Sequence, residues 1–182
     1  MINKIFWDID ECLIHSLLNK PNQEHIRFTL ENDENTYYTI IRPCAQKLID
    51  YARELVGKDN VYILTTSTTD YANTINEKAG WGFERDHIIA REEIQRHLIP
   101  TAYGGSAYIE KEGIAHKDNV LIDNLPYREN RGKTVLIGIL EDHYLKVRDY
   151  YGVNGTEDWF EEDVVEFLKE KMMDIPADSG NQ

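Results

Sequence analysis

Short apolar runs that end abruptly in polar residues divide this chain into alternating strands and helices. The runs at 5–7, 61–64 and 120–122 are continuously apolar and too short for helices. Such runs, separated by stretches with helical spacing, are typical of parallel strands that are buried on both faces. The pattern therefore predicts an α/β fold in which helices cover a central parallel sheet.

The stretches between these runs carry the patterns of a hairpin and of amphipathic helices. Alternating residues at 25–30 and 36–41 flank the polar turn ENDEN, which predicts a β-hairpin after the first strand. Residues 16–23 before it are expected to form a loop, and 44–56 carry apolar side chains at helical spacing. The remaining expected elements are a helix at 70–79, short strands at 87–90 and 134–140, and a final helix at about 157–171 whose Trp159, Phe160, Val164, Phe167 and Leu168 pack inward.

Polar side chains follow each of the three apolar runs. Asp8 and Asp10 come after the first, hydroxyl residues fill 65–69 after the second, and Asp123 and Asn124 end the third. The carboxyl ends of parallel strands meet at one edge of a sheet, where α/β proteins bind ligands. Carboxylate and amide oxygens suit Mg²⁺, which would also offset repulsion between this edge and a phosphate. Solvated acids, and hydroxyl groups that only cap a helix, are the alternatives.

The charge of the chain narrows its possible partners. The 20 basic and 33 acidic residues give a net charge of −13, which argues against tight binding to a nucleic-acid polymer. Cys12 and Cys44 are the only cysteines, so no disulfide framework is predicted, although one bridge between them stays open. No run approaches the roughly 18 apolar residues of a membrane span, and the N-terminus lacks a signal peptide. A soluble, cytoplasmic protein with no membrane partner is expected.

Two other kinds of phosphate-handling site can be tested on the sequence, and both fail. A P-loop needs a glycine where Tyr127 stands, and the GKT triplet at 132–134 precedes a strand instead of following one. A cysteine phosphatase needs an arginine six residues after its cysteine, where this chain has Leu18 or Asp50. A receiver-like module with a phosphoacceptor aspartate stays open, although it would not open the chain with an acid pair.

Four short motifs, in order along the chain, resemble those of haloacid-dehalogenase-type (HAD) phosphatases. They are DIDEC at 8–12, Thr65 after YIL, a lysine upstream of the late strand, and the aspartate of VLIDN. DIDECLIHS is similar to the DLDETLVHS of NLI-interacting-factor-like, or polymerase carboxy-terminal-domain, phosphatases, and IIRPC, ILTTSTTDYA and VLIDNLP also resemble segments of that group. The likeness covers most of residues 3–170. It implies a HAD-like Rossmannoid three-layer sandwich with a small β-hairpin insert after strand 1 and no large cap domain.

The resemblance implies a role for each acid of these motifs. Asp8 would be the nucleophile that forms an aspartyl-phosphate, and Asp10 would protonate the leaving oxygen and then activate water. Asp8, the backbone carbonyl of Asp10 and Asp123 would hold Mg²⁺, with Asn124 supporting that shell.

The resemblance also assigns the groups that contact phosphate. Thr65 and Thr66 would bind phosphoryl oxygens, and a lysine would neutralise the charge that develops in transfer. Lys111, in YIEK, matches the lysine of the group best, and Lys117 is the alternate. Cys12 stands where the group has threonine, and it is expected to pack rather than react.

The expected function is that of a Mg²⁺-dependent phosphomonoesterase acting on a phosphoprotein or another accessible phosphate. A 5′(3′)-nucleotidase or polynucleotide-end phosphatase of the same superfamily is the first alternative, and a non-catalytic HAD-fold binding protein is the second. One domain is expected over 1–173, with the hairpin insert at about 24–42, a flap or loop insert at about 99–108, and a flexible tail at 174–182.

Overall fold

A five-stranded parallel sheet forms the centre of the molecule. The computed structural model describes residues 1–96, 98–100, 106–108, 116–127, 135–136, 139–153 and 159–173. The strand order is β11-β9-β1-β5-β6, so the first strand lies between β9 and β5. These strands are β1 (Ile5–Trp7), β5 (Val61–Leu64), β6 (Ile88–Ile89), β9 (Val120–Asp123) and β11 (Tyr144–Lys146). The predicted central parallel sheet is confirmed.

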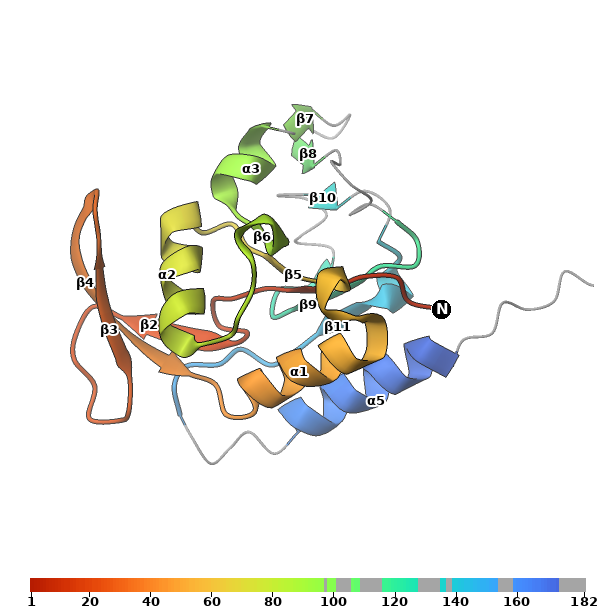
Figure 1. The fold of residues 1–182 in the computed structure, drawn as a ribbon, viewed down its shortest axis with the longest axis horizontal. Helices are drawn as coiled ribbons and strands as arrows, with labels where there is room; N and C mark the ends of the chain where they lie inside the picture. Colours follow the sequence, from red (N-terminus) through yellow and green to blue (C-terminus); the bar gives the residue numbers. More distant parts are fainter. Residues whose placement is uncertain are drawn as a thin grey trace, which may run out of the picture.

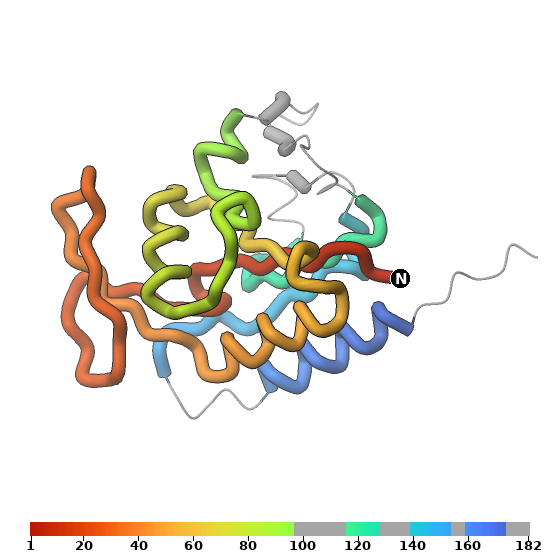
Figure 2. The backbone as a smooth tube through the Cα atoms, viewed as in Figure 1, coloured from red at the N-terminus to blue at the C-terminus, as the bar shows by residue number. Residues whose placement is uncertain are grey.

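Helices cover both faces of the sheet, because successive strand residues point to opposite faces. Ile5 and Trp7 belong to the core shared with α1 (Ala45–Val56), α2 (Thr69–Ala79) and α5 (Phe160–Met173). Phe6 belongs to a second core that includes Ile94 of the short helix α3 (Arg91–Arg96). Figure 1 and Figure 2 show α1 and α5 lying side by side along the sheet. The expected three-layer α/β arrangement is therefore confirmed.

The helix after β5 begins at a side-chain cap, close to the polar end of that strand. The hydroxyl of Thr68 accepts the backbone N–H of Tyr71 at 3.3 Å. Gly80 ends the helix in the left-handed conformation that glycine adopts most easily. With this start, Tyr71 lies one helical turn after the hydroxyl residues that follow β5.

A separate antiparallel sheet holds the predicted hairpin, which is confirmed. Its strand order is β2-β4-β3, and it consists of β2 (Ile14–Leu17), β3 (Ile26–Leu30) and β4 (Asp33–Ile41). Figure 1 shows β3 and β4 beyond α2, on the side away from the edge strand β11. The expectation of a loop from residue 16 onward is wrong at its start, because β2 pairs with β4 through residue 17. Only the distant partner strand decides this, because one buried and three half-exposed residues carry no local strand signal.

The later strands differ from the predicted ones. Of the run at 134–140, β10 (Val135–Leu136) is the strand that the structure describes, and it pairs with β8 (Ser106–Tyr108) in a separate sheet. β8 also pairs with β7 (Leu98–Pro100), which begins just before the stretch expected to form a flap. The central sheet contains β11 as an edge strand, and not the predicted strand at 134–140. Three residues without a long apolar run do not mark a strand in the sequence.

The final helix begins later than predicted. Its first residue is Phe160, which is buried together with Val164 and Leu168 as expected. Trp159 precedes the helix and is 63% exposed, so the expectation that it packs inward is wrong. No helix within the described ranges is long and apolar enough to cross a membrane. The predicted tail at 174–182 lies outside these ranges.

Gly152 holds the return segment after β11 against the hairpin sheet. Its φ is +77°, and a Cβ at this position would lie 2.7 Å from Ile40 Cδ1 and 3.4 Å from His15 Cδ2. We expect Gly152→Ala to lower the free energy of unfolding by about 2–4 kcal/mol, through backbone strain and overpacking. Gly80→Ala is the matched control, because its φ is +69° and nothing lies within 4 Å of the added Cβ. Urea unfolding of both variants separates the cost of the close contact from that of backbone strain, because Gly80→Ala introduces strain alone. Equal losses of unfolding free energy in the two variants would contradict the proposed contact.

Candidate functional site

Three side chains predicted for the site lie at the carboxyl edge of the central sheet. Asp8 follows β1, Asp123 ends β9, and Thr65 follows β5; β1 pairs with both of the other strands. β1 and β9 are in register at their ends, so Asp8 lies beside Asp123. The backbone N–H of Asp8 donates to the Ile122 carbonyl at 3.0 Å, which continues the pairing past β1. The central position of β1 thus brings the three motifs together.

The carboxyl group of Asp8 lies in surroundings that oppose its negative charge. Burial raises the pKa of Asp8 well above the usual range, and the carboxylates of Asp123 and Asp10 raise it further. A hydrogen bond from the backbone N–H of Ile9 offsets only part of this. Because a nucleophilic carboxylate must be ionised, a cation beside Asp8 would favour its reactive form.

Asp10 lies in a tight turn that takes the chain out of the sheet. The backbone N–H groups of Leu13 and Ile14 donate to the Ile9 carbonyl at 2.8 and 3.2 Å. Glu11 adopts a positive φ of 55° within this turn. The extended conformation that would direct Asp8 and Asp10 the same way therefore ends before Asp10, and the two acids have separate surroundings.

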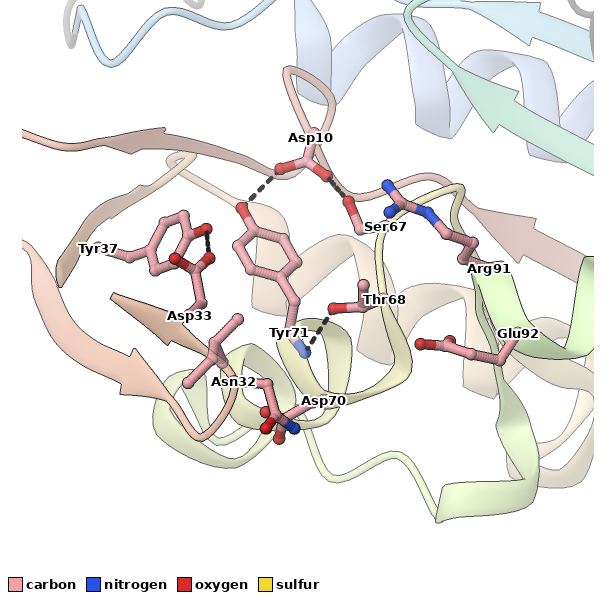
Figure 3. A pocket seen from close by; sticks show the side chains of 11 residues that line it. Asp10, Asn32, Asp33, Tyr37, Ser67, Thr68, Asp70, Tyr71, Arg91 and Glu92 are labelled. Atoms are coloured by element: carbon pink, nitrogen blue, oxygen red, sulfur yellow. Dashed lines mark hydrogen bonds between the residues drawn. The ribbon is translucent and has the colours of Figure 1, made fainter. Parts of the chain in front are cut away.

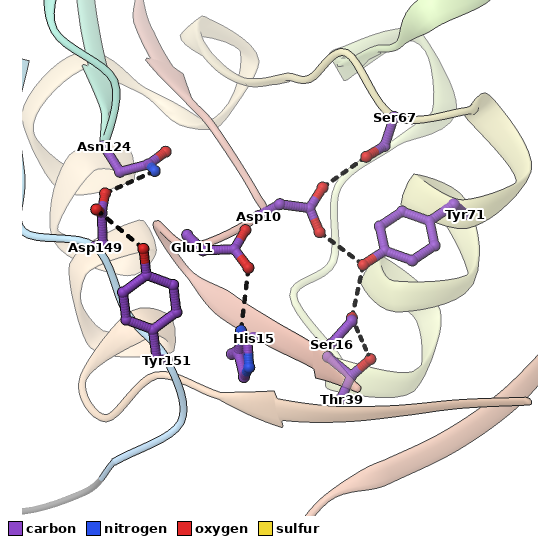
Figure 4. Close-up of polar contacts among 10 residues, drawn as sticks. All are labelled: Asp10, Glu11, His15, Ser16, Thr39, Ser67, Tyr71, Asn124, Asp149 and Tyr151. Atoms are coloured by element: carbon purple, nitrogen blue, oxygen red, sulfur yellow. Dashed lines mark hydrogen bonds and ion pairs between the residues drawn. The ribbon is translucent and has the colours of Figure 1, made fainter. Parts of the chain in front are cut away.

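Two hydroxyl groups hold the Asp10 carboxylate (Figure 4). Tyr71 donates to Oδ1 at 2.7 Å, and Ser67 donates to Oδ2 at 2.6 Å. Ser16 shares a 2.6 Å hydrogen bond with Tyr71 and one of 2.7 Å with Thr39. Because the single hydroxyl hydrogen of Tyr71 goes to Asp10, Ser16 must donate to Tyr71. The chain of hydroxyl groups fixes the orientation of the Asp10 carboxylate.

The sequence carried a partial signal for this arrangement. Ser67 is one of the hydroxyl residues at 65–69 that the sequence predicts as ligands or helix caps, whereas nothing in the sequence singles out Tyr71, four residues later in ILTTSTTDYA. Burial, followed by the charge of Asp10, raises the pKa of Tyr71, so its hydroxyl stays protonated and able to donate. Nothing in the sequence marks Ser16 and Thr39 as part of the site, because β2 and β4 bring them to Tyr71 only in the folded chain.

The hydroxyl residues after β5 form a polar turn beside Asp10. Thr65 is 3% exposed, and its Oγ1 accepts the backbone N–H of Ser67 at 3.1 Å. No group among the described residues accepts a hydrogen bond from the Thr65 hydroxyl. This hydroxyl can therefore donate to a ligand. Thr66 is exposed, and its carbonyl accepts from Nε of Arg91 at 2.8 Å. Arg91 lies against this turn from α3, a placement that the sequence did not indicate.

Asn124 is oriented by an acid that the sequence did not single out. Its side-chain nitrogen donates to Asp149 Oδ1 at 2.9 Å, and Tyr151 donates to the other oxygen of Asp149 at 3.2 Å (Figure 4). An ionised carboxylate only accepts, so the amide nitrogen must face Asp149 and the amide oxygen is turned away from it. That oxygen remains available as a metal ligand or to support the metal shell.

The structure describes one of the two candidate lysines. Lys111 lies outside the described residues. Lys117 is exposed in the turn before β9, at the amino end of that strand, whereas Asp123 lies at its carboxyl end. The structure therefore does not bring Lys117 to the edge where Asp8 and Asp123 meet.

The oxygen atoms at this edge fit a Mg²⁺ ion. The carboxylates of Asp8 and Asp123, the Asp10 carbonyl and the Asn124 amide are hard ligands of the kind that Mg²⁺ prefers. The unfavourable environment of the Asp8 carboxylate is what a bound cation would relieve. Over the described ranges, no three His, Cys, Asp or Glu side chains form a metal cluster. A set with only two carboxylates, completed by a carbonyl and an amide, is consistent with that finding.

Neither cysteine has the surroundings of a nucleophile. Cys12 is buried, its Sγ donates to the Ile122 carbonyl at 3.8 Å, and burial raises the pKa of its thiol. Cys44 is exposed, and both cysteines are free, so the bridge left open by the sequence is absent.

A cavity of about 530 Å³ opens beside Asp10 (Figure 3). Its walls come from the hairpin and from α2 and α3, and it is lined by Asp10, Leu30, Asn32, Asp33, Tyr37, Ser67, Thr68, Asp70, Tyr71, Arg91 and Glu92. A volume of this size is in the range of small-ligand pockets. The cavity therefore extends the site from Asp10 toward the hairpin.

Comparisons with known proteins agree with this fold. Two similar solved structures are a variant of the fission yeast RNA polymerase II CTD phosphatase Fcp1 bound to beryllium fluoride and a structure of Fcp1 described as an essential RNA polymerase II CTD phosphatase. The first has 14% identity and a TM-score of 0.54, covering 93% of this chain and 52% of that chain. The second has 16% identity and a TM-score of 0.58, covering 93% and 51%. This chain thus spans about half the length of each, and the likeness shows a shared fold.

No curated protein matches the chain. The model of one family, described as NLI interacting factor-like phosphatase, matches residues 4–177. That match includes every residue of the candidate site, from Asp8 to Asn124. The chain therefore belongs to the NLI interacting factor-like phosphatase family.

Proposed function

We propose that this chain is a Mg²⁺-dependent phosphomonoesterase that acts on phosphoserine or phosphothreonine in proteins through a phosphoryl group carried by Asp8. The observation that carries the proposal is the meeting of Asp8, Asp123 and Thr65 at the ends of three adjacent parallel strands. The proposed nucleophile, a second carboxylate for the cation and a hydrogen-bond donor to the phosphate would then act at one point.

The first half-reaction moves the phosphoryl group from substrate to protein. A carboxylate oxygen of Asp8 attacks phosphorus, an O–P bond forms, and the bond between phosphorus and the leaving oxygen breaks. Asp10, protonated for this step, gives its proton to the leaving oxygen, so that the substrate departs as an alcohol. The bonds from Tyr71 and Ser67 keep the Asp10 carboxyl in position for that transfer.

The second half-reaction returns Asp8 to its starting state. Asp10, now ionised, takes a proton from a water molecule whose oxygen attacks phosphorus, and the bond to Asp8 breaks. Inorganic phosphate leaves, and Asp10 is again protonated. The hydroxyl groups that donate to Asp10 hold its carboxylate in place for this step.

The phosphoryl oxygens need donors and positive charge around them. The hydroxyl of Thr65, with that of Thr66, would donate to these oxygens. Lys111 would supply the positive charge assigned to the motif lysine, and Arg91 lies next to the same polar turn. Mg²⁺, held by Asp8, Asp123, the Asp10 carbonyl and Asn124, would offset the repulsion between phosphate and carboxylates.

A protein substrate fits better than a nucleic-acid end. The net charge of −13 and the acids around the cavity beside Asp10 would repel the further phosphates of a polynucleotide. A phosphorylated side chain in a protein brings only one phosphate to the site. Among the residues that the structure describes, no contact favours a nucleotidase or an inactive binding protein.

Turnover of p-nitrophenyl phosphate tests the proposal. We expect hydrolysis that requires Mg²⁺, is lost with EDTA and returns when Mg²⁺ is added back, because the cation offsets the charge at Asp8. Mg²⁺ should also raise the melting temperature of the wild type, but not that of Asp123→Asn, as expected for a ligand that binds the folded state. No turnover with any divalent cation would contradict the enzyme proposal.

A further inference from the structure

The cavity beside Asp10 lies where the rest of the substrate must be. In the proposed reaction Asp10 protonates the leaving oxygen, so the phosphorylated residue departs on the side of Asp10. Asp10, Ser67 and Tyr71 form part of the cavity wall, and the tip of the hairpin contributes another part. A cavity of about 530 Å³ can hold one or two side chains that neighbour the phosphorylated residue.

Charges are distributed unevenly around this cavity (Figure 3). Arg91 is held on the phosphate side, because its backbone N–H donates to the Ser67 carbonyl at 2.8 Å and its Nε donates to Thr66. Three carboxylates, those of Asp33, Asp70 and Glu92, lie farther out along the walls. Positive charge therefore lies next to the site of reaction, and negative charge lies beyond it.

None of the three outer carboxylates forms an ion pair with any residue that the structure describes. Asp33 accepts the Tyr37 hydroxyl, and Glu92 accepts the hydroxyl of Thr69 at 2.5 Å. These hydroxyl groups lower the pKa of each acid, so both are negatively charged at neutral pH.

The side chain of Asp70 has no hydrogen-bond partner in the described part of the chain. The cavity thus carries three like charges that a cationic ligand would neutralise. Leu30, Tyr37 and Tyr71 also line the cavity. Apolar and aromatic surfaces of this kind suit the methylene groups and the charged end of a long basic side chain.

We propose that the cavity binds a lysine or arginine side chain next to the phosphorylated residue, and that Asp70 and Asp33 determine this preference. The substrate class would then be phosphoproteins with a basic residue beside the phosphorylated serine or threonine. The inference rests on the proposed function and specifies its substrate. A second phosphate in the same position, as in a polynucleotide, would meet three negative charges.

Matched phosphopeptides test the inference. Each peptide carries one phosphoserine, and lysine, glutamine or glutamate is placed in turn at each of the three positions before and after it. For the wild type at low salt, the value of kcat/KM at one or more positions should be about two- to fivefold higher with lysine than with glutamine. The preference should shrink when the ionic strength rises from about 0.05 to about 0.5 M, because the pairs are exposed to solvent.

Substitutions in the cavity connect the preference to particular acids. Asp70→Asn and Asp33→Asn should each lower the lysine-to-glutamine ratio, and Asp70→Lys should reverse it in favour of glutamate, a total change of about tenfold. Asp163→Asn is the matched control. Asp163 and Asp70 both lie in the first turn of a helix, so both asparagine variants lose the same interaction with the helix dipole, but Asp163 does not line the cavity.

The ratio of two peptides on one protein sample cancels losses that a variant causes in folding or in general activity. A lysine preference that Asp70→Lys reverses and Asp163→Asn leaves unchanged is the expected result. Equal rates with lysine, glutamine and glutamate peptides, or a ratio that Asp70→Lys does not change, would overturn the inference and leave the phosphatase proposal standing. Failure of the wild type to hydrolyse p-nitrophenyl phosphate would instead contradict the proposed function itself.

Discussion

Replacing Asp8 with asparagine is expected to abolish turnover while the protein stays folded. The amide cannot attack phosphorus, so kcat for p-nitrophenyl phosphate should fall by at least about 10⁴-fold. The substitution removes one of several neighbouring negative charges, and burial already disfavours the ionised Asp8 carboxyl. The melting temperature should therefore be unchanged or slightly higher than that of the wild type.

The control for this variant is Asp163→Asn, which lies in the first turn of α5 and outside the site. It should retain the activity of the wild type. Residual turnover above about one per cent in well-folded Asp8→Asn protein would mean that another group is the nucleophile, because loss of a nucleophile costs several orders of magnitude in rate.

Replacing Asp10 with asparagine is expected to slow both half-reactions. The loss in the first half-reaction should depend on the leaving group. Loss of a general acid or base costs about 10²- to 10⁴-fold in rate. A p-nitrophenolate ion leaves without help from an acid, whereas the alkoxide of serine does not. The variant should therefore lose far more activity on a phosphoserine peptide than on p-nitrophenyl phosphate.

Hydrolysis of the intermediate still needs a base, so p-nitrophenol should appear in a rapid burst of about one equivalent per protein molecule, followed by slow turnover. Stopped-flow absorbance measures this burst. Equal losses on both substrates without a burst would contradict the assignment of two roles to Asp10.

The hairpin sheet has a direct connection to this chemistry. Ser16 of β2 and Thr39 of β4 form the chain of hydroxyl groups that ends, through Tyr71, on Asp10 (Figure 4). The same hairpin supplies Leu30, Asn32, Asp33 and Tyr37 to the cavity. The insert after the first strand therefore supports the candidate general acid and forms a wall for the substrate.

The central part of the site could be predicted from the sequence, because it depends on local pattern and on one rule of topology. Apolar runs that end in polar residues mark strand ends, and parallel strands bring those ends to one edge. Asp8, Thr65 and Asp123 lie at that edge as this reasoning expected. Their chemical roles stay predictions that the proposed experiments test.

The residues that orient this set could not be predicted, because tertiary packing brings them to the site. Tyr71 reaches Asp10 from a helix, Asp149 reaches Asn124 from the segment after an unpredicted edge strand, and Arg91 reaches Thr66 from α3. No pattern of spacing distinguishes these side chains from solvated ones. The same reason explains the missed strands β2 and β11, whose partners lie far away along the sequence.

The covalent intermediate is the central claim, and its location is the most direct test. Wild type, Asp10→Asn and Asp8→Asn proteins would be incubated with p-nitrophenyl phosphate and Mg²⁺, quenched in acid, digested and analysed by mass spectrometry. The phosphoryl group should lie on the peptide that contains Asp8, with the highest occupancy in Asp10→Asn and none in Asp8→Asn. A phosphoryl group on any other peptide, or one that persists in the Asp8→Asn protein, would contradict the mechanism.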